Sequence, residues 1–279
     1  MATETTLTSA KAWHPDVTGI APSEAVPEAL ILRTSTVAGR VEGDEPAVRV
    51  QFVADDEADF VAEGAPIPES DPDLAEVVVH TGKVAQLIRL SREQWVQPDA
   101  ATTLSESVRR AVTKRANLAY IAQVAPVAPA FTPPAGLINI AGILDGGAVA
   151  ANLDALIDVM ATIEGNGGTP SHLILSPTAW AALAKLKVGT GSEQNLLGAG
   201  THATERMLLD LPVLVTPAAP EGSGLVVDKA AIASAVGDVM VATSDHVYFD
   251  SDSIALRCTW RFGANVVHPD RIAKFTVTA

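Results

Sequence analysis

The stretch that decides the fold spans residues 62–93 and reads AEGAPIPESDPDLAEVVVHTGKVAQLIRLSRE. Its first half is acidic and stiffened by three prolines, and its second half alternates apolar and polar residues as a strand does. A strand that continued from residue 74 to 90 would span about 55 Å, whereas strands typically stop near about 5 to 6 residues. Such a strand would project beyond a compact domain. The Thr-Gly pair at 81–82 also allows a turn or a bulge, so both interpretations stay open.

Charge is distributed unevenly around this stretch. Residues 42–76 hold twelve acids against Arg49 alone, a net of −11 out of a formal net charge of −14 for the chain. Residues 102–124 hold four basic residues against Glu106, a net of +3. This asymmetry favours two surfaces that each contact a partner. Two solvated faces explain the charges equally well.

Composition narrows the functional class. A chain of 279 residues, 48% of them apolar, can bury a sizeable core in one large domain or two small ones. Its net acidity argues against binding in a DNA groove and against an anionic membrane surface. No apolar run approaches the roughly 20 residues of a membrane helix, and the N-terminus lacks a signal-peptide pattern. Cys258 is the only cysteine, so no internal disulfide can form and a reducing cytosol fits best.

The first part of the chain predicts an arm followed by strands. Residues 1–28 are polar, contain three prolines and show no helical or strand period, which predicts an extended N-terminal arm. Residues 29–41 are predicted to be rich in strand. Residues 47–55 alternate Val48, Val50 and Phe52 with other side chains, as a strand with one buried face does.

Residues 102–124 form the clearest helix pattern and would extend about 33 Å. An apolar stripe follows one side of this helix, and Thr103 with Glu106 predicts a capping box at its start. Glu106, Arg110 and Lys114 form a row at i,i+4 spacing. A proline-rich segment then ends the helix and leads into a second region.

Residues 137–240 alternate helix and strand patterns, which predicts a mixed α/β domain. The expected elements are a helix at 148–164, a strand at 171–176, a helix at 177–187 that begins with proline, and strands at 211–217 and 224–230. A glycine-rich segment at 188–204 is expected to be mobile. Two further β segments, 253–269 and 271–279, are expected to pair with strands near 30–40 and 75–90, which would make the first domain discontinuous.

Patterns that carry chemistry are weak throughout. The six histidines show no i,i+4 pair, so zinc chemistry has no support, and Cys258 lies in an alternating strand that predicts a buried, inert thiol. The glycines at 189–200 lack a GxGxxG or Walker lysine pattern. The acidic run at 55–59 lacks the glycine and closing glutamate of a calcium loop. We therefore expect no catalytic, cofactor-binding or metal-binding residue, and no enzyme.

Four segments, in the same order, resemble parts of the major capsid proteins of tailed bacteriophages, which have the Hong Kong 97-type fold. Residues 61–93, with their AE and PESD core, resemble the return arm of the family's extended loop, which runs into a strand and then SRE. LILSPTAWAALAKLK (173–187) resembles its strand–proline–tryptophan helix, and LLDLPVLVTPAAP (208–220) resembles its GLPV strand. GLIN (136–139) matches the start of its axial domain. The match covers nearly the whole chain from about residue 28.

The resemblance implies a mixed α+β capsid fold with named parts. In order, these are an N-terminal arm (1–28), a first part of the peripheral domain (29–136) with an extended β loop (about 42–76) and a long spine helix (about 102–124), an axial α/β domain (137–240), and peripheral return strands (241–279). The axial domain would surround the centre of the capsomer.

Two departures from the family pattern matter. Some relatives cross-link subunits through a lysine near the loop tip and an asparagine of a neighbour, helped by a glutamate. Here those positions fall at Gly64, near Asp252 and near Thr259, and no lysine lies between Lys11 and Lys83. Without an amine nucleophile an isopeptide cannot form, so a non-covalent shell is expected. Some relatives also begin with a scaffolding domain that is cleaved off, whereas Met1 lies almost at the arm here.

The expected function is self-assembly into an icosahedral shell around the dsDNA genome of a tailed bacteriophage. The expected partners are copies of the chain in hexamers and pentamers, a portal, a separate scaffolding protein, an optional decoration protein, and packaged dsDNA without sequence specificity; no membrane is expected. The shell would be assembled in the cytoplasm of the host bacterium and form the virion capsid. An encapsulin-type nanocompartment is the alternative, and a soluble α/β enzyme with a site near residues 189–200 is a weaker one.

The acidic loop is expected to lie over a neighbouring subunit, near the basic row of that subunit's spine helix. No cofactor or metal takes part in this contact. The expected subunit-interface residues are Glu63, Pro66, Glu69 and Asp71 on the loop, and Arg109, Arg110, Lys114 and Arg115 on the helix.

Overall fold

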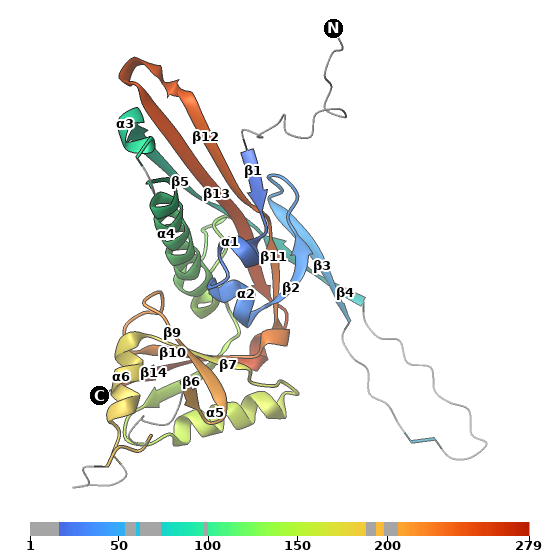
Figure 1. Ribbon diagram of the computed structural model, residues 1–279. Coiled ribbons are helices and arrows are strands. Elements are labelled where there is room, and N and C mark those ends of the chain that lie inside the picture. The colour runs from blue at the N-terminus through green and yellow to red at the C-terminus, as the bar shows by residue number, and fades with distance from the viewer. Residues whose placement is uncertain are drawn as a thin grey trace.

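The computed structural model describes residues 17–53, 60–61, 74–97, 100–187, 194–197 and 206–278. These residues form a mixed α+β fold with two six-stranded sheets and a separate two-stranded ribbon (Figure 1). The ribbon projects from the side of the first sheet, and the second sheet lies beyond the C-terminal end of helix α4 (Ala100–Ala122).

The first sheet is built around one long strand, β13 (Ser253–Val266), which pairs with three others. Its order is β1 (Val17–Ile20), β12 (Val239–Tyr248), β13, β11 (Ile232–Val236) and β2 (Thr36–Arg40), with β5 (Gly82–Ser91) also paired to β13. The β5–β13 register runs without a shift from Ser253 opposite Ser91 to Phe262 opposite Gly82. The antiparallel pair β12–β13 extends past the N-terminal end of α4, on the side of α3 (Figure 1).

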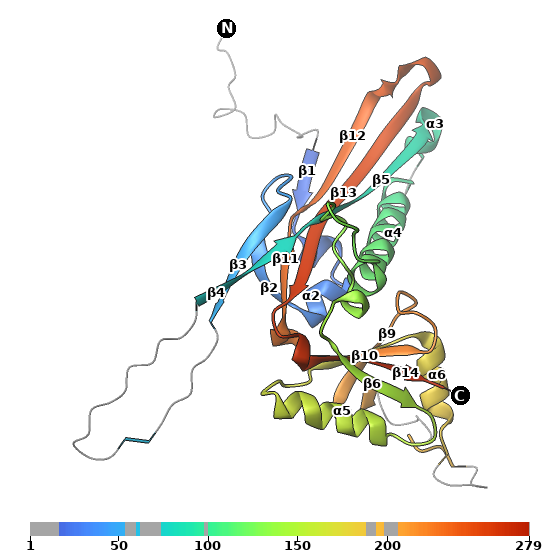
Figure 2. The same cartoon turned by 180° about the vertical axis from the view of Figure 1, so that it is seen from behind.

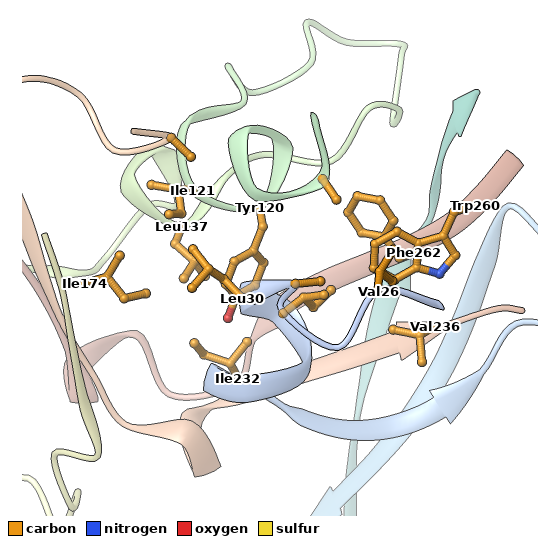
Figure 3. Close-up of a cluster of buried hydrophobic side chains, with 14 of the residues drawn as sticks. Val26, Leu30, Tyr120, Ile121, Leu137, Ile174, Ile232, Val236, Trp260 and Phe262 are labelled. Carbon is orange, nitrogen blue, oxygen red and sulfur yellow. The ribbon is translucent and has the colours of Figure 1, made fainter. Parts of the chain in front are cut away.

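Helix α4 buries its apolar stripe against this sheet and against the two short helices α1 (Pro22–Ala25) and α2 (Leu30–Thr34). Figure 3 shows the shared core, in which Trp260 and Phe262 of β13 lie near Val26. The two rings are 4.5 Å apart between centroids, and Trp260 donates from its indole nitrogen to the carbonyl of Gly237 at 2.9 Å. The indole is therefore both fully buried and satisfied.

A buried hydroxyl pair ties α2 to α4. Thr34 Oγ1 donates to the carbonyl of Leu30 at 2.9 Å, and it lies 3.0 Å from the hydroxyl of Tyr120. Because the threonine proton is used on Leu30, the tyrosine hydroxyl is the donor in the second bond. Leu30 in turn donates from its backbone nitrogen to Asn117 Oδ1 at 2.9 Å. These bonds fix the position of α2 on α4.

The second sheet holds the remaining core. Its order is β6 (Leu144–Val149), β14 (Ile272–Val277), β10 (Ser223–Val227), β7 (His172–Leu175), β9 (Leu211–Val215) and β8 (Met207–Leu208). Helices α5 (Asp154–Gly165) and α6 (Pro177–Lys185) pack on it. Helix α6 starts with proline and is capped by Ser176, whose hydroxyl accepts from the nitrogen of Ala179 at 3.1 Å.

The ribbon consists of β3 (Ala47–Val53) and β4 (Leu74–His80), paired antiparallel over their full length. Figure 2 shows it leaving the first sheet at an angle, as a separate element. Its inner side packs on a small apolar cluster that includes Val41, Val50 and Val79. Thr81 lies outside both strands, and β4 pairs with β3 whereas β5 pairs with β13, so the interpretation as one continuous strand is wrong. The interruption is a single residue.

The remaining helical elements of the described residues are short: α3 (Arg92–Trp95) and the 3₁₀ turns η1 (Leu137–Asn139), η2 (Lys229–Ala231), η3 (Phe249–Ser251) and η4 (Pro269–Arg271). Turn η4 redirects the chain after β13 into the second sheet, where β14 pairs with β10 and with β6. The prediction that residues 271–279 pair with strands near 30–40 and 75–90 is therefore wrong. Strand β11 conversely precedes residue 240 and lies in the first sheet. Sheet membership thus crosses the expected boundary at residue 240 in both directions.

Three local predictions are corrected. Residues 30–34 are helical because Leu30 and Ile31 are buried in the core that they share with α4, and only Thr36–Arg40 form a strand. Helix α4 already begins at Ala100, so Thr103 lies inside it and forms no capping box. The helix expected at 148–164 begins at Asp154, because β6 continues to Val149. Its buried side chains are Leu156, Val159 and Ile163, whereas Ile157 is exposed.

Candidate functional site

The exposed basic side of α4 borders a groove between α2, α4 and strand β9 of the second sheet. We call this the cationic groove; it runs from α1 and α2, along α4, to the loop after β9. Its lining residues are Val26, Pro27, Glu28, Leu30, Arg33, Arg109, Arg110, Thr113, Lys114, Asn117, Leu118, Arg206 and Pro212–Ala218. Five of the lining side chains are cationic, and Glu28 is the one carboxylate among them.

Four of these five cations form no ion pair with a residue in the part of the chain that the structure describes. Arg110 lies 3.6 Å from Glu106 across one helical turn, which confirms part of the expected i,i+4 row. Arg109 and Lys114 form no ion pair with any residue in the described ranges, and both are exposed. Arg206 stacks over the ring of Trp180 with 5.7 Å between its guanidinium carbon and the ring centroid. The groove therefore carries excess positive charge on a chain that is acidic overall.

The floor of the groove is apolar. Val26 is buried there, and Leu118, although part of α4, keeps 42% of its surface exposed. Pro217 and Ala218 close the groove from the second sheet. An apolar floor with a cationic rim suits a partner segment that carries both acidic and apolar side chains.

Arg115 lies on a different side of α4 from the other three basic residues. It lines a separate depression with Lys83, Pro133 and Pro134, and donates to Gln123 Oε1 at 3.0 Å. Successive helix residues are about 100° apart, so one residue separates Lys114 from Arg115 by more than a quarter turn. The structure thus brings Arg109, Arg110 and Lys114 together and leaves Arg115 apart.

The expected interface residues of the loop, Glu63, Pro66, Glu69 and Asp71, lie outside the described residues. The acids at the base of the loop are described, and two of them are paired within the chain. Asp44 lies 3.0 Å from Lys83 Nζ, which holds the pKa of its carboxyl below the usual value, and Glu76 lies 3.0 Å from Arg49.

The structure describes two of the three positions at which the family resemblance places the cross-linking residues. Asp252 lies between β12 and β13 in a left-handed conformation, φ 41°, and accepts from Arg92 Nε at 2.7 Å. Thr259 lies inside the first sheet, opposite Met240 and Ala85. Gly64 lies outside the described residues.

Catalytic features are sparse where the chain is described. No group of three or more histidine, cysteine or carboxylate side chains could hold a metal ion in that part of the structure. Cys258 is 3% exposed and burial raises the pKa of its thiol, as expected of an inert cysteine. His172 is half-buried, and burial together with Arg33 and Lys229 lowers its pKa. None of the helices in the described ranges is long and apolar enough to cross a membrane.

Sequence patterns missed two cations of the groove, Arg33 of α2 and Arg206 before β8. They are separated by more than 170 positions and meet only because α2 packs on α4 beside β9. No local spacing could have revealed them.

Comparisons with known proteins agree with the resemblance. The model of the phage capsid family matches residues 25–277. A structure from Gordonia phage Cozz superposes with a TM-score of 0.68 at 15% identity, covering 97% of this chain and 90% of that one. One from Mycobacterium phage Ogopogo gives 0.62 at 18% identity, covering 96% and 94%.

A third solved structure, the capsid of a native GTA particle, gives a TM-score of 0.66 at 15% identity and covers 100% of this chain and 96% of that one. At these identities the superpositions establish the fold. The search of curated proteins finds no match. Because the family model spans nearly the whole chain, the chain belongs to the phage capsid family and is a major capsid protein.

Proposed function

We propose that this major capsid protein builds the icosahedral head of a tailed bacteriophage by non-covalent self-assembly into hexamers and pentamers around dsDNA. Its activity in this proposal is assembly and not catalysis. The observation that carries the proposal is the cationic groove, whose Arg109 and Lys114 are exposed and form no ion pair among the described residues of a chain with net charge −14. The complementary surface is the acidic loop, residues 62–73, of a second copy.

Charge pairing of this kind selects the partner more than it supplies affinity. Each exposed ion pair contributes about 0–1 kcal/mol and is screened by salt. Repetition of the same contact around a closed, symmetric shell multiplies that contribution and fixes the register of neighbouring subunits. The apolar floor around Val26 and Leu118 offers the loop's apolar residues, such as Ile67, an additional area to bury.

The remaining assignments follow the family resemblance. Residues 1–28 would be the N-terminal arm, α4 the spine helix and the β3–β4 ribbon the base of the extended loop. The first sheet would be the core of the peripheral domain and the second sheet that of the axial domain. A portal, a separate scaffolding protein and an optional decoration protein would complete the particle, which would assemble in the cytoplasm of the host bacterium.

The test of loop docking is a double charge reversal in the groove, Arg110→Glu with Lys114→Glu. It changes the charge by −4, removes the i,i+4 pair with Glu106 and places a like charge there instead, which together cost about 1 kcal/mol or less of folding stability. The matched control reverses two exposed cations outside the groove, Arg257→Glu with Lys185→Glu.

Shell yield is measured by sedimentation and negative-stain electron microscopy, and folding by circular dichroism. We expect the groove variant to remain folded and to lose most of its shells, whereas the control assembles as the wild type does. Unchanged shell yield and stability in the groove variant would show that this electrostatic contact is not used.

Two further measurements distinguish this proposal from the alternatives, an encapsulin and a covalently cross-linked shell. The family match does not favour an encapsulin, and the contents of purified shells decide the matter: dsDNA supports the phage head, whereas an enclosed protein would support a nanocompartment. Boiled shells should run as a single band near 28.9 kDa in a denaturing gel. A ladder of heavier bands would overturn the non-covalent assignment.

A further inference from the structure

The joint between the ribbon and the first sheet is organised by one side chain, Arg261 of β13. The chain enters the ribbon through the turn at residues 41–46 and leaves it through Thr81. Both connections lie over β13, where Arg261 is opposite Lys83 of β5 in the strand register. One guanidinium therefore faces the entry and the exit of the ribbon together.

Arg261 bonds to both connections. Its Nη1 donates to the carbonyl of Glu45 at 3.2 Å, in the entry turn, and to Thr81 Oγ1 at 3.0 Å, at the exit. Its Nε lies 3.5 Å from Asp44 Oδ1, which also accepts from Lys83 Nζ at 3.0 Å. Only 19% of the Arg261 side chain is exposed, in contrast to the arginines of the other ion pairs in the described ranges.

Thr81 completes the joint from the opposite side. It is fully buried, donates from its hydroxyl to the carbonyl of Glu45 at 2.5 Å, and donates from its backbone nitrogen to the carbonyl of Pro46 at 2.9 Å. Its hydroxyl thus accepts from Arg261 and donates to Glu45 at once. The three residues form a closed set of bonds across the base of the ribbon.

The other contacts at the joint are less directional. The apolar cluster around Val50 and Val79 holds the ribbon close to β11 but permits small rotations, because dispersion and burial depend weakly on angle. Asn265 adds one bond, from Nδ2 to the carbonyl of Val78 at 3.0 Å. A planar guanidinium with several fixed donors constrains direction more strongly than either.

We propose that Arg261 is a positioning residue for assembly, which sets the direction in which the β3–β4 ribbon leaves the subunit. The inference rests on the proposed function, because that direction matters only when the ribbon carries the loop onto a second copy. A seven-residue strand is about 23 Å long, so a tilt of about 10° at its base moves its far end by about 4 Å. Such a shift exceeds the length of a hydrogen bond and would break the register with a neighbour.

The test compares Arg261→Lys, which keeps the charge and loses the fork, with Thr81→Val, which removes the bridging hydroxyl. Thr81→Ser restores the hydroxyl and serves as the rescue variant. Arg49→Lys is the matched control, since Arg49 forms an exposed ion pair with Glu76 on the ribbon itself. Each purified chain is assembled at a temperature where its far-UV circular dichroism equals that of the wild type, and particle diameters are measured by electron microscopy.

We expect Arg261→Lys and Thr81→Val to give several-fold fewer closed shells of wild-type diameter, with open or irregular particles in their place. Thr81→Ser and Arg49→Lys should give the wild-type distribution. If Arg261→Lys does not fold, the Thr81 pair decides the question. Wild-type diameters and yields for the folded variants would overturn the role of the joint, whereas a wild type that forms no shells would overturn the proposed function itself.

Discussion

Replacing Gly263 with alanine tests how closely the ribbon joint is packed onto the first sheet. Gly263 lies in β13, opposite Ala235 of β11. The connection between β4 and β5 passes next to it. A Cβ atom at this position would lie 2.1 Å from the carbonyl oxygen of His80, 2.9 Å from its carbonyl carbon and 3.1 Å from the Cα of Thr81. All three are backbone atoms, so no side-chain rotation can relieve the clash.

The joint must therefore shift as a unit. Overpacking of this kind typically costs about 1–3 kcal/mol. For a chain of this size, each kcal/mol lowers the melting temperature by about 2–4 °C, so Gly263→Ala should melt about 2–12 °C below the wild type. The glycine shows no positive φ, so backbone strain contributes nothing to this figure.

Gly165→Ala is the matched control. Gly165 ends helix α5 and shows no positive φ, and a Cβ atom there would meet no heavy atom within 4 Å beyond its chain neighbours and the backbone of its own helix. Alanine is the better helix former by about 1 kcal/mol, so this variant should melt at the wild-type temperature or slightly above it. The assay is differential scanning calorimetry of the unassembled protein. A Gly263→Ala variant within about 1 °C of the wild type would refute the steric reasoning and show that the β4–β5 connection moves freely away from β13.

Three further predictions concern single groups. Tyr120→Phe should lower the free energy of unfolding in urea by only about 0.5–1.5 kcal/mol, because Thr34 keeps its bond to Leu30. Thr34→Val should lower it by about 1–3 kcal/mol, because it removes the acceptor of a buried phenol. The reverse order would contradict the assignment of Tyr120 as the donor. Cys258 should react slowly with a thiol reagent at neutral pH in the folded chain and fully in urea, since burial raises its pKa; rapid labelling of the folded chain would contradict this. Lys83 lowers the pKa of Asp44, so the ionised Asp44 stabilises the fold above about pH 4 and loses this effect as the pH falls through its folded pKa. The difference in melting temperature between the wild type and Asp44→Asn should therefore shrink below about pH 4. A constant difference would contradict the pairing.

Elements with a strong local pattern were predictable from sequence. The alternation at β3, the apolar stripe of α4 and the Ser-Pro start of α6 each specify their structure through nearest neighbours along the chain. Helix α2 was not predictable, because its segment LILRT favours a strand locally and becomes helical where Leu30 and Ile31 pack against α4. Strand β6 was missed because two glycines interrupt its apolar pattern.

The candidate site also contains residues that the sequence predicts and residues that it does not. The pair Glu106–Arg110 follows from helical spacing alone, and the structure confirms it. Arg33 and Arg206 join the groove through contacts between α2, α4 and β9, and Arg261 reaches the ribbon through the β5–β13 register. Such positions depend on which distant elements become neighbours, and no spacing in the sequence encodes that choice.

In the proposed function, the distribution of paired and unpaired charge is the reason that the groove would bind a segment from outside the subunit. At the ribbon base and the adjoining sheet, three described acids are matched within the chain: Asp44 by Lys83, Glu76 by Arg49 and Asp238 by Arg40. In the groove, several positively charged side chains line the same surface. Because the screening length at physiological ionic strength is about 8 Å, charges closer together than this still repel one another. An acidic segment that enters removes this repulsion and gains attraction at the same step. If the proposed docking is correct, the groove stays solvated in the isolated subunit and selects an acidic surface during assembly.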